Sequence, residues 1–111
     1  MNIRLSTLAE FKLLQLLQYL EDEWSAKSKE KFLENFRIKM KYLAQNPHAS
    51  KQSNIRPDLR CFVLTKQNTL IYTIQDDSIL VVTIFDTRQN PEVLRREIKE
   101  HFGDFTNDWT Y

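Results

Sequence analysis

The sequence has 111 residues, which is enough for one domain with its own hydrophobic core. Sixteen basic residues face fifteen acidic ones, so the net charge of +1 supplies no general attraction to nucleic acid. The single glycine, Gly103, excludes glycine-rich loops that cradle nucleotide phosphates. The single cysteine, Cys61, excludes an internal disulfide and a cysteine-based zinc site, and is typical of the reducing cytoplasm.

No signal peptide is recognised, and no apolar run is long enough to span a membrane. We therefore expect a cytoplasmic protein without membrane contact. The sequence also lacks a motif for a cofactor, and the acidic pair Asp76 and Asp77 has no further carboxylate or histidine spaced to complete a metal site. We expect no cofactor and no metal.

The N-terminal part of the chain predicts a strand and a long helix. Apolar and polar residues alternate over residues 1–5, as in a short strand. Thr7 and Glu10 have the spacing of a capping box, which predicts a helix over residues 8–24. Its buried side is predicted from four apolar residues at helical spacing, which are Leu13, Leu17, Leu20 and Trp24.

A second helix is predicted over residues 26–45. Ser25 is a favourable N-cap, and Pro47 ends the helix because the residue before a proline avoids helical angles. Its buried stripe is predicted to contain Phe32, Phe36, Met40 and Leu43. Since almost no loop separates the two helices, they are expected to lie antiparallel as a helical hairpin.

The second half of the chain predicts three strands and a third helix. Residues 47–58 form a polar connector without periodicity. The strands are predicted at residues 59–64, 69–75 and 79–85, and their short turns make neighbours antiparallel. The last strand is the most apolar and is expected to be central and buried. Pro91 opens a helix over residues 91–102, with Leu94 and Ile98 facing inward.

The order β-α-α-β-β-β-α predicts an α+β fold, in which a curved, mostly antiparallel sheet is covered on one face by the helical hairpin. We expect one domain over residues 1–111. Gly103 is expected to end the last helix, and residues 103–111 are expected to form an acidic, aromatic tail.

This order, together with the residues at the element ends, resembles the RelE/ParE superfamily of toxins from type II toxin–antitoxin modules. The resemblance covers residues 3–94 and is closer to the ParE-like branch. The matching segments are Leu8-Ala9, Asn46-Pro47, Leu59-Arg60, Leu70-Ile71-Tyr72, Asp76-Asp77-Ser78-Ile79 and Phe85-Asp86-Thr87-Arg88-Gln89-Asn90-Pro91. In the ParE-like branch an Arg-x-x-Pro sequence follows the last strand, as it does here.

The resemblance implies a small toxin, active in growth inhibition and plasmid stabilisation, that is neutralised by a cognate antitoxin wrapping its surface. It also implies one of two activities. Relatives of RelE cut messenger RNA on the ribosome with arginine, lysine, tyrosine or histidine side chains and without metal. Relatives of ParE poison DNA gyrase and have no recognised nuclease constellation.

Arg88 is the first candidate for target binding, because a guanidinium just beyond a core strand can bind a phosphate or a carboxylate through two bonds. Gln89 beside it is a further candidate. The alternative is a solvated turn arginine, or one that pairs with Asp86 or Glu92.

Arg60 heads the strand after the connector and is a second candidate for a phosphate or antitoxin contact, although a strand-edge salt bridge is favoured there. Arg56 in the connector is also a candidate, but a loop cation of this kind is more often simply solvated. If the protein is a nuclease, Arg88 and Arg60 are the catalytic candidates.

A metal-independent ribonuclease needs a base, a group that stabilises the phosphorane and an acid. Thr69 stands where RelE-like nucleases carry an arginine, and the strand of residues 59–64 lacks their paired lysines. His48 and His101 do not closely follow the last strand, and Tyr72 is expected in the core. We therefore favour a protein that is not an enzyme.

Three functions remain in competition: a ParE-like toxin that binds DNA gyrase, a RelE-like ribosome-dependent mRNA endonuclease, and a non-toxic protein-binding module on the same fold. The balanced charge favours a protein partner over the phosphates of the ribosome. The surface expected to receive the antitoxin comprises the outer grooves of the helical hairpin and the exposed edge of the sheet.

Overall fold

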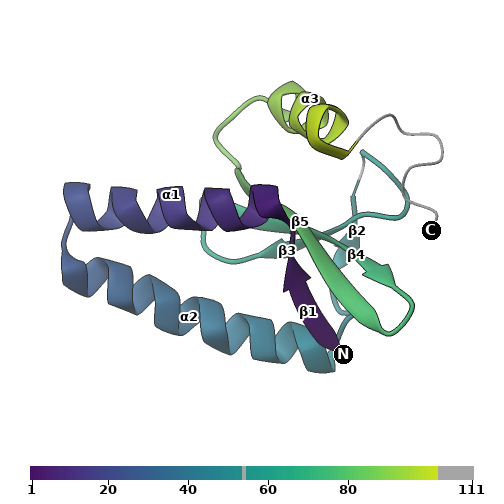
Figure 1. Ribbon diagram of the computed structural model, residues 1–111, viewed down its shortest axis with the longest axis horizontal. Coiled ribbons are helices and arrows are strands. Elements are labelled where there is room, and N and C mark those ends of the chain that lie inside the picture. The colour runs from purple at the N-terminus through teal and green to yellow at the C-terminus, as the bar shows by residue number, and fades with distance from the viewer. Residues whose placement is uncertain (54, 103–111) are drawn as a thin grey trace.

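The computed structural model describes residues 1–53 and 55–102 and has the predicted α+β architecture (Figure 1). A layer of strands lies between a helical hairpin and a shorter helix. In chain order the elements are β1 (Asn2–Leu5), α1 (Thr7–Glu23), α2 (Ala26–Gln45), β2 (Lys51–Gln52), β3 (Arg60–Val63), β4 (Asn68–Gln75), β5 (Ser78–Asp86) and α3 (Pro91–Phe102). The tail of residues 103–111 and the predicted helix end at Gly103 lie outside the described residues.

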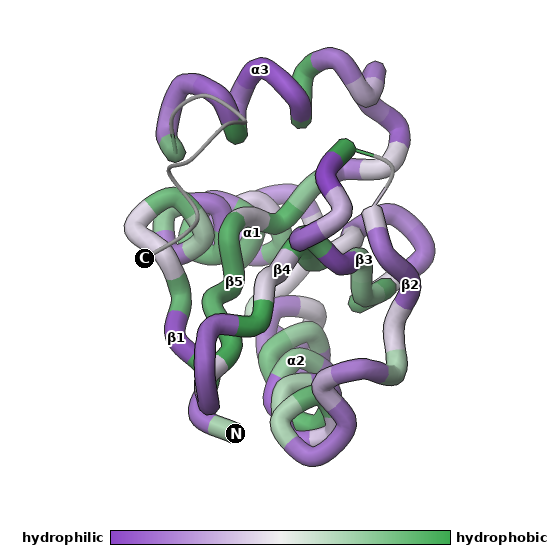
Figure 2. Tube along the Cα trace, turned by 90° about the vertical axis from the view of Figure 1, so that its right-hand side faces the viewer, coloured by the Kyte–Doolittle hydropathy of each residue, from purple (hydrophilic) through white to green (hydrophobic). Residues whose placement is uncertain are grey.

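The sheet has the strand order β1-β5-β4-β3-β2. β1 runs parallel to β5, with Ile3 opposite Ile79, and the remaining neighbours are antiparallel. The predicted meander is thus confirmed, and β5 is an interior strand as expected. In Figure 2 the helices α2 and α3 lie on opposite sides of the strands. Both faces are therefore covered, which explains why β5 is apolar along almost its whole length.

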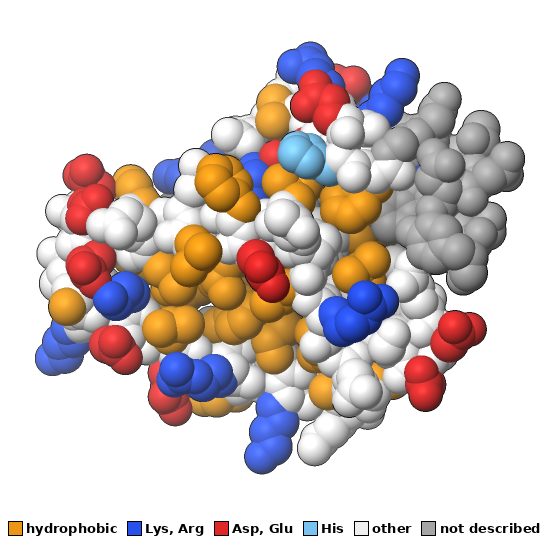
Figure 3. Space-filling view, viewed as in Figure 1, with side chains coloured by type: hydrophobic (Ala, Val, Ile, Leu, Met, Phe, Trp, Pro, Cys, Tyr) orange, Lys and Arg blue, Asp and Glu red, His pale blue; other side chains and the backbone are white. Residues whose placement is uncertain are grey.

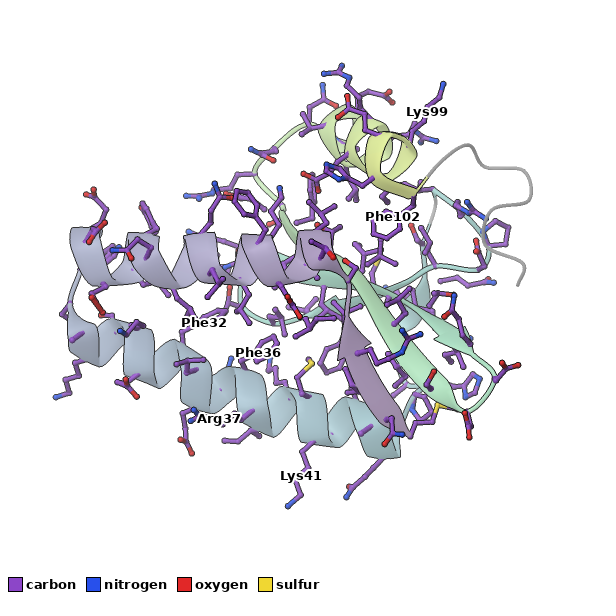
Figure 4. The ribbon with its side chains drawn as sticks, in the orientation of Figure 1. Phe32, Phe36, Arg37, Lys41, Lys99 and Phe102 are labelled. Atoms are coloured by element: carbon purple, nitrogen blue, oxygen red, sulfur yellow. The ribbon has the colours of Figure 1, made fainter. Side chains whose placement is uncertain are left out.

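The helical hairpin covers one face of the sheet. Phe32, Phe36 and Leu43 are buried, and Met40 packs against them, so the predicted stripe of α2 is confirmed. In Figure 4 Phe32 and Phe36 point from α2 toward the hairpin interior, whereas Arg37 and Lys41 point away from it. The sheet side of this core consists of Leu64, which directly follows β3, and the strand residues Leu70, Tyr72, Ile79, Val81 and Ile84.

The opposite face of the sheet is covered by α3. Leu94 and Ile98 are buried against a second core cluster, as predicted. Its strand-side members are Leu59, Ile71, Val82 and Phe85. Alternation along β4 places Leu70 and Tyr72 in the first cluster and Ile71 in the second. A bulge lies at this point: Ile71 pairs with Thr83, but Tyr72 pairs with Val81, so β5 carries one extra residue.

The start of α1 differs from the prediction. The N-cap is Ser6 rather than Thr7, because the Ser6 hydroxyl accepts the Ala9 amide at 3.0 Å and donates to the Val82 carbonyl at 2.7 Å. Ser6 therefore caps the helix and also ties it to β5. The second helix has the predicted bounds, and Ser25 caps it by accepting the Ser28 amide at 3.0 Å.

Two further expectations are corrected. Trp24 was predicted in the core, but it is 71% exposed because the α1–α2 turn extends beyond the sheet (Figure 1). The connector was predicted to lack structure, but its residues Lys51 and Gln52 pair with Cys61 and Arg60 as the edge strand β2. No helix among the described residues is long and apolar enough to cross a membrane.

Candidate functional site

The end of β5 holds Arg88 in a defined position. The Asp86 carboxylate accepts hydrogen bonds from Arg88 Nε at 3.0 Å, Nη2 at 2.7 Å and the backbone amide at 2.9 Å. The Gln89 amide donates to the Asp86 carbonyl at 3.0 Å, and the Thr87 amide donates to the Gln67 carbonyl at 2.9 Å. One aspartate therefore fixes both the turn and the side chain that follows it.

This pair stays charged over a wide pH range. The side-chain and backbone hydrogen bonds from Arg88 lower the pKa of Asp86, and Asp86 raises the pKa of Arg88. The Arg88 side chain nevertheless remains 62% exposed. The Asp86 carboxylate accepts one N–H from Nε and one from Nη2, so the other three of the five guanidinium N–H groups can bind a partner. Pairing with Asp86 is thus observed, while the role of Arg88 in target binding stays a prediction.

Arg88 and Gln89 lie at the rim of a surface groove of about 680 Å³. We call it the Arg88 groove. It is lined by Phe32 of α2 and by three segments, which are residues 12–24 of α1 and its C-cap, residues 65–68 around the β3–β4 turn, and residues 84–89 at and after the end of β5. Trp24 is 71% exposed and Tyr19 is 51% exposed. A basic side chain and two exposed aromatic rings thus share one hollow.

The other two predicted arginines do not join this groove. Arg60 Nη1 donates to the Ser50 carbonyl at 2.8 Å, so it holds the connector against the sheet. Arg60 pairs with Tyr72, whereas Asp86 pairs with Asn68, four residues away along β4. These two levels are about 13 Å apart along the strand.

Arg56 is buried rather than solvated, with 8% exposure. Its Nε lies 2.8 Å from Asp58 Oδ1, and the pair braces the loop before β3. The expectation of a solvated loop cation is therefore wrong, since the Arg56 side chain is buried and paired with Asp58.

The remaining reactive side chains serve the fold. Tyr72 is fully buried, as predicted, and its hydroxyl donates to the Pro47 carbonyl at 2.6 Å and also bonds to the Ser50 hydroxyl. Burial raises the pKa of Tyr72. Burial also raises the pKa of the Cys61 thiol, which is the opposite of what a nucleophile needs. Within residues 1–53 and 55–102 no group of three or more His, Cys, Asp or Glu side chains is placed to hold a metal.

A second hollow of about 600 Å³ lies between α2 and the β2–β3 edge of the sheet. We call it the edge groove; Ile38, Tyr42, Phe62, Val63, Lys39 and Lys51 are among its lining residues. Ile38 and Val63 are 60% and 59% exposed. β2 pairs with Arg60 and Cys61 only, so Phe62 and Val63 extend past the end of this edge strand. Lys39 Nζ donates to the carbonyls of Val63 and Leu64 at 3.1 and 2.8 Å.

Sequence reasoning missed Tyr19, Trp24 and Gln67 as lining residues of the Arg88 groove. Tyr19 carried a usable signal, because it lies outside the apolar stripe predicted for the first helix and so marks an aromatic ring on the surface. Gln67 carried none, since its place beside Arg88 depends on the pairing of β4 with β5.

A family model described as the ParE toxin of the type II toxin–antitoxin system parDE matches residues 3–91. The chain belongs to the ParE toxin family. This confirms the predicted membership of the RelE/ParE superfamily, and the match ends at Pro91, the last residue of the Arg-x-x-Pro sequence. A comparison with curated protein sequences returns no match.

Solved structures share the fold of this ParE-family chain. The chromosomal ParDE toxin–antitoxin system from P. aeruginosa matches with a TM-score of 0.66 and 16% identity, covering 78% of this chain and 95% of that chain. The heterotetrameric YoeB–YefM toxin–antitoxin complex from Staphylococcus aureus matches with a TM-score of 0.51 and 16% identity, covering 77% and 94%. At such identities the likeness concerns the fold alone.

Proposed function

We propose that this protein is the toxin of a type II toxin–antitoxin module, that it acts in the cytoplasm by binding a protein target, and that DNA gyrase is that target. The observation that carries the proposal is the Arg88 groove, where an arginine fixed by Asp86 shares a hollow with exposed Trp24 and Tyr19. Arginine, tryptophan and tyrosine are the residue types that contribute most binding energy at protein interfaces.

The contacts of the nuclease candidates favour binding over RNA cleavage. Cleavage without metal requires a base, an acid and a phosphate-stabilising group around one scissile bond. Here Arg60 is bonded to the Ser50 carbonyl, the Tyr72 hydroxyl is bonded to the Pro47 carbonyl, and Arg88 follows the end of β5, about 13 Å farther along the sheet. Arg60 and Tyr72 thus lie together at Ser50 but are both engaged in structural contacts, and Arg88 is separate from them.

The proposed second partner is a cognate antitoxin, and the edge groove is its proposed docking surface. The solved structures that share this fold are those of toxin–antitoxin systems. The edge groove offers exposed apolar side chains beside Lys39 and Lys51. An antitoxin segment could pair as a strand alongside Phe62 and Val63, the part of β3 that β2 leaves unpaired. Apolar side chains on that segment would match the exposed apolar residues, and carboxylates would match Lys39 and Lys51.

The test is Arg88→Ala, expressed in a host cell in the absence of antitoxin. Truncation of a hot-spot arginine typically weakens binding by about tenfold or more. We therefore expect at least about ten times as many colonies to survive expression of Arg88→Ala as survive expression of the wild type. Arg95→Ala is the matched control, because Arg95 is also exposed and also pairs with a carboxylate, Glu92, but does not line the groove. Thermal unfolding of both variants verifies that the fold is retained.

The mode of action is read in the same cells. Filamentation and a DNA-damage response with intact transcripts are expected for a gyrase poison. Transcripts cut on translating ribosomes would contradict the proposal in favour of an endonuclease. If expression of the wild type leaves growth unchanged, the protein is not a toxin, and the function that remains is a non-toxic protein-binding module.

A further inference from the structure

We propose that the Arg88 groove takes an extended, carboxylate-bearing segment of the target protein, and that Asp86 holds the place of the incoming carboxylate in the free toxin. This inference rests on the proposed function and specifies the chemistry of the partner. The segment would present a carboxylate to Arg88 and an apolar side chain to Trp24 and Tyr19.

The free protein itself displays the chemistry that Arg88 accepts. Asp86 binds the guanidinium through Nε and Nη2, the two-bond geometry that arginine forms with a carboxylate. Both partners are accessible, with side-chain exposures of 62% for Arg88 and 32% for Asp86. An ion pair this exposed is weak because water screens it, so a second carboxylate can replace the first at little cost.

Asp86 remains satisfied after such an exchange. Its Oδ1 atom also accepts the backbone amide of Arg88 at 2.9 Å, and that bond does not depend on the guanidinium. The turn therefore keeps its shape while the Arg88 side chain swings toward a partner. Asp86 fixes the turn and competes for the arginine at the same time.

The rest of the groove fits a peptide. Its lining includes the apolar side chains of Leu16, Leu20, Phe32 and Ile84 together with the exposed rings of Trp24 and Tyr19. Three glutamine side chains, Gln15, Gln67 and Gln89, line it as well. Amide groups both donate and accept hydrogen bonds, which suits the backbone of an extended segment.

The charges disfavour a nucleic acid as the occupant. Lys12 is the other basic residue of the groove, and its Nζ lies 2.6 Å from Glu97 Oε2. Both cations of the groove thus already have a carboxylate partner, whereas a phosphate backbone is bound by groups that neutralise successive phosphates. A protein segment can bind by replacing a single carboxylate, that of Asp86, with its own carboxylate at Arg88.

The experiment compares three variants in growth inhibition and in binding to purified DNA gyrase. Trp24→Ala and Arg88→Ala should each weaken binding by at least about tenfold, as expected of hot-spot residues. Asp86→Asn should bind about two- to fivefold more tightly, because the Asp86 carboxylate no longer competes with the target for Arg88, and by no more than that because an exposed ion pair is weak. Toxicity should follow the same order.

Phe11→Ala is the matched control for Trp24→Ala. Phe11 is an aromatic residue of the same helix, is 57% exposed and lines neither groove. Its loss should change neither binding nor toxicity. Thermal unfolding verifies the fold of Asp86→Asn, whose amide can still accept the backbone bond from Arg88.

The outcomes separate this inference from the proposed function. If all variants bind gyrase like the wild type, the groove inference is overturned while the gyrase proposal stands. If toxicity depends on Trp24 and Arg88 but the wild type does not bind gyrase, the groove inference stands and the target is a different protein. Binding of a single-stranded RNA oligonucleotide that is lost in Trp24→Ala would overturn a protein segment as the occupant.

Discussion

Asp86 and Arg88 show how a two-residue spacing becomes a structural unit. The carboxylate accepts three hydrogen bonds from Arg88, one of them from the backbone. The sequence allowed this pairing to be anticipated because Asp86 ends β5 and Arg88 follows two residues later, in the turn. Their neighbours in the groove come together only in the tertiary structure, since Tyr19 reaches it through the packing of α1 against the sheet and Gln67 through the pairing of β4 with β5.

The hydrogen bonds to Asp86 predict its titration. Because they lower its pKa, Asp86 should lose its charge below the ordinary value of about 3.9. A lowered pKa means that the stabilisation is present above the ordinary pKa and is lost as the pH falls through the lower folded-state value. NMR titration of the Asp86 carboxyl should give a midpoint that moves upward in Arg88→Ala. An unchanged midpoint in that variant would contradict the assigned cause.

Among the helices, α2 was predictable and the start of α1 was not. Ser25 and Pro47 are local signals, and both act as their residue types suggest. At α1 both Ser6 and Thr7 are able to cap a helix, and the choice is decided by the bond from Ser6 to the Val82 carbonyl, far away in sequence. The edge strand β2 escaped prediction for the same reason, because its two polar residues form a strand only through pairing with β3.

α3 is held to the sheet by a few defined contacts. Leu94 and Ile98 are buried in the second core cluster. Glu97 forms an ion pair with Lys12 at 2.6 Å and accepts from the Thr83 hydroxyl at 3.0 Å, so one side chain joins α3 to α1 and β5. In Figure 4 Lys99 points outward from α3, while Phe102, which packs against this cluster, lies on the sheet side.

Ile98 should therefore carry much of the attachment of α3. It is fully buried, and Ile98→Ala is expected to lower the free energy of unfolding by about 2–4 kcal/mol through lost burial and the cavity left behind. Val93→Ala is the control. Because Val93 is 37% exposed, this substitution should lower the free energy of unfolding by well under half as much as Ile98→Ala. Urea unfolding measures both, and hydrogen exchange should show faster opening of α3 amides in Ile98→Ala. Equal costs in the two variants would contradict this packing.

At the scale of the whole molecule, the proposed contacts with target and antitoxin lie in two separate hollows. The Arg88 groove borders α1, the edge groove borders α2, and their lining residues do not overlap. Figure 3 shows basic and acidic side chains interspersed around the apolar side chains of the helical hairpin, without a large basic field on that face. The sequence predicted this charge balance from composition, but the positions of the two hollows required the tertiary structure.

Separate surfaces predict separable functions. Val63→Ser should reduce binding to the proposed cognate antitoxin without reducing growth inhibition, because Val63 lines the edge groove and not the Arg88 groove. Arg88→Ala should do the reverse and still bind the antitoxin. Co-expression and co-purification measure both effects, with Val93→Ser on α3 as the control for loss of an exposed valine. Loss of toxicity and of antitoxin binding together in Val63→Ser would show that one surface serves both partners.

The parallel pairing of β1 with β5 has a consequence during translation. Ile3 meets Ile79 only after most of the chain has been made, although the intervening helical hairpin forms from local contacts. The walls of the Arg88 groove come from α1 and from the end of β5, so they cannot meet before that moment either. A nascent chain is therefore expected to stay harmless until its last strand emerges, and a truncated product that ends before Ser78 should never acquire the groove.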